Sequence, residues 1–97
     1  MRKPLNEKVA IITGAGQGIG KGLALALAKR GVKIVCVGRR LAPIEETAEE
    51  IKALGGQALA ISCNTADREM VNEVVKKTVE TFGTVDVMIN NAQSIPK

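Results

Sequence analysis

Four glycines lie within seven residues of the chain, and their spacing is typical of a site that binds an anion. Gly14, Gly16, Gly18 and Gly20 follow an apolar run, KVAIIT (residues 8–13), and helical periodicity follows them. Backbone N–H groups at a helix start are unpaired, and the helix dipole there favours negative charge. In such a turn Gly14 lets the chain reverse, Gly18 lets a pyrophosphate approach the backbone, and Gly20 lets the helix pack closely. The pattern favours a dinucleotide site; the alternative is a tight turn without a ligand.

Two arginines lie at a second position that matters in such a site, because the residue type there distinguishes between two dinucleotides. The next apolar run ends at Gly38-Arg39-Arg40, about 20 residues past the glycines, where an acid binds the ribose of NAD and arginine accommodates the 2′-phosphate of NADP. A guanidinium group can fork onto a phosphate that a carboxylate would repel. Arg39 and Arg40 therefore favour NADP(H) over NAD(H). The alternative is that both are ordinary surface arginines.

Apolar runs alternate with helical patterns along the whole chain, which predicts βαβ units and a parallel sheet. The predicted strands are residues 8–13, 33–37, 57–62 and 85–90, and the predicted helices are residues 18–30, 41–54 and a third that Thr65 or Asp67 caps and Gly83 ends. The third helix is expected to carry on its inner side Met70, Val71, Val74, Val75, Thr78, Val79 and Phe82. The fold class is therefore α/β.

Composition excludes several kinds of site within this sequence. Its 97 residues include no His, Tyr or Trp, so they hold no Ser-His-Asp triad, no histidine-ligated metal and no aromatic platform for nucleic acid. The net charge of +4 comes from scattered basic residues, so a nucleic-acid partner is not expected. Cys36 and Cys63 lack metal-ligand spacing and are expected to be buried thiols, and no metal site is predicted. No signal peptide or membrane span is expected, which favours the cytoplasm.

The motifs resemble those of the short-chain dehydrogenases/reductases over residues 8–94. Thr13-Gly14-Ala15-Gly16-Gln17-Gly18-Ile19-Gly20 is similar to that family's Thr-Gly-x-x-x-Gly-x-Gly motif, and Asn90-Asn91-Ala92-Gln93 resembles its Asn-Asn-Ala-Gly motif. The resemblance implies a Rossmann-like sheet in the order 3-2-1-4. It implies cofactor contacts for the residues Gly14, Gln17, Gly18, Ile19, Gly20, Arg39, Arg40, Asn64, Thr65, Asn91 and Ala92.

Two departures from the family pattern limit what the resemblance implies. Gln93 replaces the glycine of the second motif and places a side chain where cofactor and backbone would approach. The family's catalytic Ser, Tyr and Lys come after the fourth strand, and this sequence ends at Lys97 without a Tyr. No catalytic residue is therefore assigned.

The chain is expected to be the N-terminal part of a dinucleotide-binding domain, over residues 1–97, with an incomplete four-stranded sheet. The fourth strand would then be an exposed apolar edge, and the single helix on its face would leave that face partly uncovered. The resemblance implies the NADP(H)-binding portion of an oxidoreductase that interconverts an alcohol and a carbonyl. A small-molecule substrate and a homo-oligomer are expected only for a full-length form. The alternative is a truncated, non-catalytic module that binds a nucleotide or pairs with another subunit.

Overall fold

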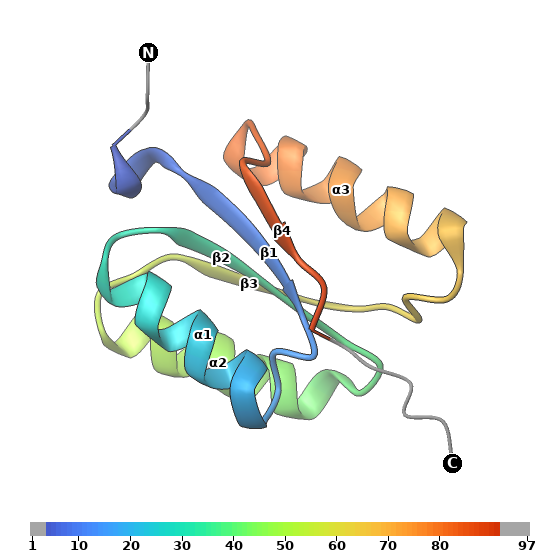
Figure 1. The fold of residues 1–97 in the computed structure, drawn as a ribbon, viewed down its shortest axis with the longest axis horizontal. Coiled ribbons are helices and arrows are strands. Elements are labelled where there is room, and N and C mark those ends of the chain that lie inside the picture. Colours follow the sequence, from blue (N-terminus) through green and yellow to red (C-terminus); the bar gives the residue numbers. More distant parts are fainter. Residues whose placement is uncertain (1–3, 92–97) are drawn as a thin grey trace.

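A computed structural model describes residues 4–91 of the chain, and the Ala92 and Gln93 of the second motif lie outside them. A short 3-10 turn (Leu5–Glu7) precedes alternating strands and helices (Figure 1). The elements in chain order are β1 (Val9–Thr13), α1 (Gly18–Lys29), β2 (Lys33–Gly38), α2 (Leu41–Ala53), β3 (Ala58–Ser62), α3 (Arg68–Phe82) and β4 (Val87–Ile89).

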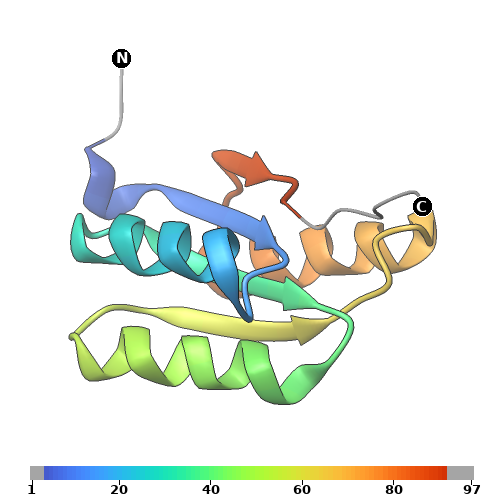
Figure 2. The ribbon, with the colours of Figure 1, turned by 60° about the horizontal axis from the view of Figure 1, so that its bottom comes forward.

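The four strands form one parallel sheet, as the sequence pattern predicts, in the order β3-β2-β1-β4 that the family resemblance implies. Ile11 lies at the centre of this sheet, opposite Val35 on one side and Met88 on the other. Because all strands run the same way, their carboxyl ends lie along one edge of the sheet (Figure 2). The chain leaves β1 toward β2 but returns from α3 to β4 on the opposite side. This reversal of direction is where open α/β sheets bind ligands.

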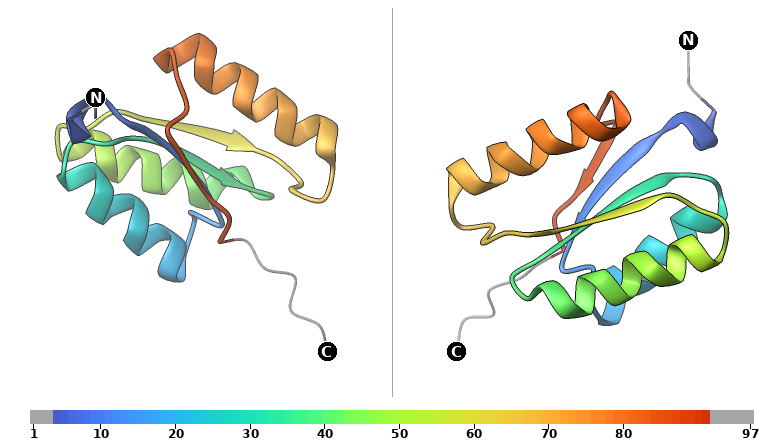
Figure 3. Two further views of the ribbon diagram at one scale, coloured as in Figure 1. Left: turned by 45° about the horizontal axis from the view of Figure 1, so that its top comes forward. Right: turned by 180° about the vertical axis from the view of Figure 1, so that it is seen from behind.

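The sheet is buried between two helical layers. Helices α1 and α2 cover one face and α3 covers the other (Figure 3). Alternate residues of β1 point to opposite faces, so Ile12 packs under α1 and α2 while Ile11 packs under α3, and both are fully buried. All five residues of β1 are buried, as expected for a central parallel strand.

The helices begin and end close to the predicted residues. Of the two cap candidates for α3, Asp67 is the one that caps it: its carboxylate accepts hydrogen bonds from the N–H groups of Glu69 and Met70. The inner side of α3 is narrower than predicted. Val74 and Thr78 are buried, whereas Met70 and Val79 lie at the margins and are 39% and 44% exposed.

Strand β4 is shorter than predicted and lies at the edge of the sheet. It spans three residues, and its Val87 and Met88 are 40% and 47% exposed. Val85 lies outside the strand but packs in the core below α3. The expectation of an exposed apolar edge therefore holds for β4 in the described part of the chain. Among residues 4–91, no helix is both long enough and apolar enough to cross a membrane.

An ion pair joins the two helices that share a face. The Lys21 ammonium group of α1 lies 2.7 Å from a carboxylate oxygen of Glu50 in α2 and 4.0 Å from one of Glu46. The hydrogen bond to Glu50 raises the pKa of Lys21 above its ordinary value. The pair is partly exposed, so it helps to set the relative position of α1 and α2 more than it stabilises them.

Both cysteines are free and buried, and they lie on opposite faces of the sheet. Cys36 packs under α1 and α2, and Cys63 packs on the opposite face under α3. Burial raises the pKa of Cys36 to about 12 from an ordinary 9.0. Burial, followed by the charge of Asp67, raises the pKa of Cys63. Neither thiol is therefore a reactive thiolate near neutral pH.

Burial of both thiols predicts that an aromatic disulfide reagent at pH 8 reacts with neither thiol in the native chain and with both in urea. Rapid labelling of Cys63 alone in the native chain would contradict the packing of α3.

Alkali should also destabilise the fold. Above about pH 9 the unfolded chain loses the Cys36 proton while the folded chain keeps it, so the free energy of unfolding falls as the pH rises toward 12. Cys36→Ala should flatten this fall, measured by urea unfolding at pH 8, 9 and 10.

Candidate functional site

The glycine turn between β1 and α1 has the backbone shape that its sequence predicts. Gly14 and Gly18 have φ angles of +65° and +60°, in the left-handed region that side chains disfavour. Gly20 is buried, and a Cβ atom there would overlap the carbonyl oxygen of Gly14 and come within 2.7 Å of the Asn91 amide nitrogen. Close packing of α1 against the turn therefore requires a glycine at position 20.

The residues that follow β4 hold the end of β1 and the start of the turn through hydrogen bonds from the second motif. The Thr13 hydroxyl accepts from the Asn91 N–H at 2.8 Å and lies 3.1 Å from the side-chain oxygen of Asn90. The Asn91 side chain donates to the Gly14 carbonyl at 3.5 Å. The two motifs, 77 residues apart in the chain, thus meet at the boundary between β1 and β4.

The remaining strand ends are joined to the turn by a continuous set of hydrogen bonds. The Ala15 N–H donates to the Val37 carbonyl of β2 at 3.3 Å. The Ser62 hydroxyl at the end of β3 donates to the Arg39 carbonyl at 2.9 Å, next to a backbone bond from Cys63 to Gly38. The structure therefore brings the glycine turn, the arginine pair and the loop after β3 to one edge of the sheet.

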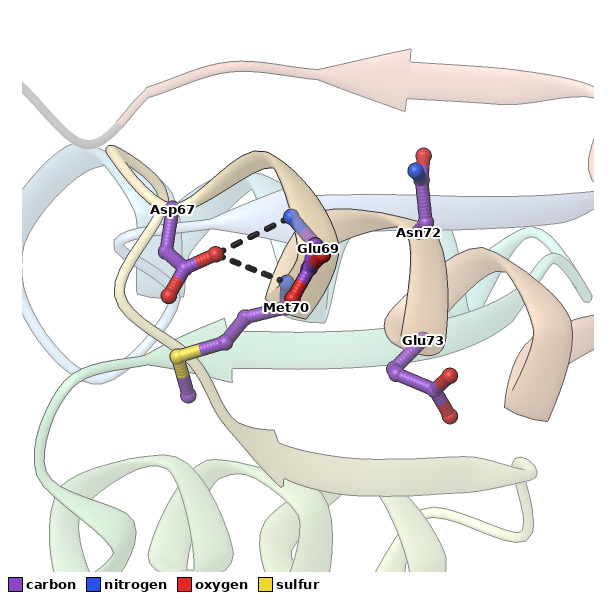
Figure 4. Close-up of a pocket in the computed structure, with 5 residues that line it drawn as sticks. All are labelled: Asp67, Glu69, Met70, Asn72 and Glu73. Carbon is purple, nitrogen blue, oxygen red and sulfur yellow. Dashed lines mark hydrogen bonds between the residues drawn. The ribbon is translucent and has the colours of Figure 1, made fainter.

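The first turn of α1 differs from that of α3 in how its N–H groups are satisfied. Gln17 is the N-cap of α1, and its side chain makes no capping hydrogen bond. Asp67 caps α3 through two backbone donors, as Figure 4 shows. No acidic residue lies in the first turn of α1. Within the described residues, the N-cap side chain therefore leaves the first N–H groups of α1 to a ligand, and the positive helix end favours an anion.

Space for a ligand lies beside the glycine turn. A Cβ atom at Gly18 would meet no protein atom within 4 Å, although the backbone conformation there still favours glycine. Ile19 is 75% exposed, while Gly20, Ala24 and Ala28 form the buried face of α1. An exposed isoleucine next to uncapped N–H groups suits a ligand with both apolar and anionic parts.

The two arginines follow β2 directly and are both exposed. Arg40 is the N-cap residue of α2 and its side chain makes no capping hydrogen bond. Within residues 4–91, neither guanidinium group forms an ion pair with a carboxylate. Both cations are therefore available to a ligand that lies over the end of β2.

The loop after β3 is built around Asn64. Its side-chain oxygen accepts from the Ala66 N–H at 3.0 Å, and its carbonyl accepts from the Asp67 N–H at 2.9 Å. Asn64 and Thr65 are half-buried. The oxygen of Asn64 retains one lone pair, so it can still accept from an amino group such as that of adenine.

Two shallow hollows lie elsewhere on the surface. One, drawn in Figure 4, is lined by Asp67, Glu69, Met70, Asn72 and Glu73 at the start of α3. Its three carboxylates would repel a phosphate, and its helix N-terminus is already capped. The other lies at the opposite end of the sheet, near Asn6 and Gly55. Neither contains a residue of the glycine turn.

One site residue was missed by the sequence reasoning. Thr47 of α2 is fully buried, and its hydroxyl donates to the Ala15 carbonyl of the glycine turn at 2.9 Å. The only local signal is a threonine on the apolar stripe of Ile44, Ala48 and Ile51. This pattern does not predict which carbonyl accepts the hydrogen bond from the hydroxyl, because Thr47 and Ala15 are 32 residues apart.

Comparison with known proteins agrees with this geometry. The family model for short chain dehydrogenase matches residues 8–96. The chain is 46% identical over 92 residues to a cyclohexanol dehydrogenase of Acinetobacter sp., covering 95% of the chain and 37% of that protein. It is 43% identical to the Bacillus subtilis short-chain dehydrogenase/reductase homolog YusS, covering 89% of the chain and 80% of YusS.

A solved structure shows the same fold. The crystal structure of a hydroxysteroid dehydrogenase from Escherichia coli superposes with a TM-score of 0.87 at 33% identity, over 95% of this chain and 41% of that one. The chain therefore belongs to the short-chain dehydrogenase family, whose members are oxidoreductases that bind an NAD(P) dinucleotide.

Proposed function

We propose that the chain binds NADP(H) and forms the cofactor-binding portion of an oxidoreductase that interconverts an alcohol and a carbonyl. The observation that carries the proposal is the uncapped N-terminus of α1 at the same sheet edge as Arg39 and Arg40, two cations that have no carboxylate partner among residues 4–91. A family that binds NAD(P) supplies the class of ligand, and the charge at the end of β2 supplies the preference for NADP(H).

Each group in the turn has a distinct part in the proposed binding. The pyrophosphate takes N–H groups of the α1 N-terminus beside Gly18 and Ile19, with Gln17 near the adenosine ribose. Gly14 and Gly20 keep the turn close to the helix, as their packing requires. Bound there, the dinucleotide supplies or accepts a hydride; the protein orients it and excludes water from one side.

The adenosine end is assigned to the ends of β2 and β3. Arg39 and Arg40 take the 2′-phosphate, because a guanidinium fork matches phosphate oxygens and neither side chain has a carboxylate partner in the described part of the chain. Asn64 accepts from the adenine amino group with its remaining lone pair, and Thr65 flanks the ring. Asn91 is assigned to the cofactor riboses, and Ala92 of the same motif lies outside the described residues.

Calorimetric titration of the 97-residue chain with NADPH, NADH and ADP tests the proposal. We expect NADPH to bind at least about tenfold more tightly than NADH, a difference of about 1.4 kcal/mol. The NADPH affinity should fall as salt is raised, because the added contact is ionic. Equal affinities for the two cofactors would remove the role of the arginines, and no binding of any nucleotide would contradict the function itself.

A second candidate is a module that binds a nucleotide, or pairs with another subunit, without turnover. It is supported by YusS, because the match to this chain covers 80% of that relative's length. It is also supported by Val87 and Met88, because these half-exposed apolar residues lie on an edge strand that a second subunit can pair with. NADPH consumption with a panel of small carbonyl compounds, measured for this chain and for a longer chain that carries catalytic residues after the fourth strand, separates the two candidates. Turnover that requires the longer chain favours the oxidoreductase. A stable 97-residue chain that binds a nucleotide or pairs with a partner, without turnover in either form, favours the module.

A further inference from the structure

The glycine turn is held from the side of α2 by one buried hydroxyl group. Thr47 is fully buried, and its Oγ1 lies 2.9 Å from the Ala15 carbonyl oxygen and 3.2 Å from that of Pro43. A hydroxyl has a single proton to donate. The Pro43 carbonyl, four residues earlier in the helix, also faces the helical N–H of Thr47. The Pro43 carbonyl therefore has a second donor on α2. The Ala15 carbonyl depends, on that side, on the shorter bond from the Thr47 hydroxyl.

Ala15 is fixed on both of its backbone groups by the β2–α2 unit. Its N–H donates to the Val37 carbonyl at 3.3 Å, and its carbonyl accepts from Thr47. The next residue packs on the same unit, because a Cβ atom at Gly16 would lie 2.7 Å from the Cβ of Pro43. The unit that carries Arg39 and Arg40 therefore also sets the position of the glycine turn.

The bond from Thr47 has a consequence for the following N–H group. A trans peptide directs its carbonyl and its N–H in opposite directions, and the described residues include no cis peptide bond. Because the Ala15 carbonyl points at Thr47, the Gly16 N–H points away from the Thr47 hydroxyl. A rotation of this peptide would put a carbonyl oxygen where that N–H donor now lies, and a carbonyl oxygen repels an anion.

We propose that Thr47 is a positioning residue for dinucleotide binding: it orients the Ala15–Gly16 peptide and fixes the turn relative to the arginine pair. The proposal rests on the proposed function, since it assigns Thr47 a part in the same site. Thr47 touches no ligand itself. The Thr47 hydrogen bond raises the fraction of chains in which the turn has the binding conformation. When that fraction falls, the apparent affinity for the dinucleotide falls with it.

Thr47→Val tests this, because valine keeps the shape and removes the hydroxyl. We expect the NADPH dissociation constant to rise about tenfold, or about 1.4 kcal/mol. Thr47→Ser restores the hydroxyl and should return the constant to within about threefold of the parent chain. Ile51→Val is the matched control: Ile51 is fully buried one turn further along α2, and its truncation loosens the same helix without touching the turn.

The amide resonance of Gly16 gives a readout that does not depend on the ligand. It should shift in unliganded Thr47→Val and stay in place in Ile51→Val. If the parent chain binds NADPH and the valine variant at position 47 binds as tightly as Ile51→Val, the role of Thr47 is overturned and the proposed function stands. An unmoved Gly16 resonance overturns it equally. If the parent chain binds no NADPH, the proposed function fails and the role of Thr47 falls with it.

Discussion

Gly20→Ala should destabilise the chain by about 3 kcal/mol or more, and a large part of the population should be unfolded at room temperature. The added Cβ would overlap the backbone oxygen of Gly14 and crowd the Asn91 amide, so helix α1 would have to move away from the turn. Overpacking against backbone costs more than against a flexible side chain, and small domains have only a few kcal/mol of stability. Urea unfolding followed by circular dichroism measures the loss.

Gly22→Ala is the control for this prediction, two residues further along the same helix. A Cβ atom at Gly22 would meet no protein atom within 4 Å. Alanine in a helix interior is favoured over glycine, so this variant should be more stable by about 0.5–1 kcal/mol. Equal stability of Gly20→Ala and the parent chain would show that α1 does not pack on the turn as described.

Arg39→Asp should weaken NADPH binding by about ten- to a hundredfold while changing NADH binding by no more than about threefold. The substitution removes a hydrogen bond to a charged group, which contributes about 1.5–3 kcal/mol, and adds a carboxylate that repels the 2′-phosphate. NADH has no 2′-phosphate, so it neither loses the hydrogen bond nor meets the repulsion. Parallel calorimetric titrations with both cofactors at one ionic strength measure the change in preference.

Lys76→Asp serves as the charge-matched control for Arg39→Asp. Lys76 is exposed on α3, away from the end of β2, and its replacement changes the net charge by the same amount. If Lys76→Asp weakens NADPH as much as Arg39→Asp does, the effect is a general one of net charge. Equal affinity of Arg39→Asp and the parent chain for both cofactors would show that Arg39 lies outside the binding site.

Local sequence was enough to predict the elements and their order. The β-branched runs, the glycines at helix ends and the helical spacing between them are short-range features, so each strand and helix lies within a few residues of its predicted position. Asp67 and Thr65 were equivalent as cap candidates, because both residue types cap helices well. Only the structure shows that the Asp67 carboxylate reaches two N–H groups.

The backbone shape of the glycine turn could also be predicted, because it depends on consecutive residues. The left-handed conformations of Gly14 and Gly18 follow from the turn itself, and the arginines follow from the end of the next strand. How helix α3 is rotated on the sheet could not be predicted. Its apolar residues span more than one face, and the exposed sides of Met70 and Val79 were set by the sheet beneath them.

The sequence by itself determined a strand–turn–helix with a glycine-rich turn, alternating βαβ elements and two cations at the end of β2, since each depends on neighbouring residues. Only the tertiary structure decided what holds that turn in place: Asn91 on the Gly14 carbonyl and Thr47 on the Ala15 carbonyl. These partners lie 77 and 32 residues away. A hydroxyl or amide can bond any carbonyl within reach, so the choice is made by the packing of strands and helices that brings one carbonyl to it.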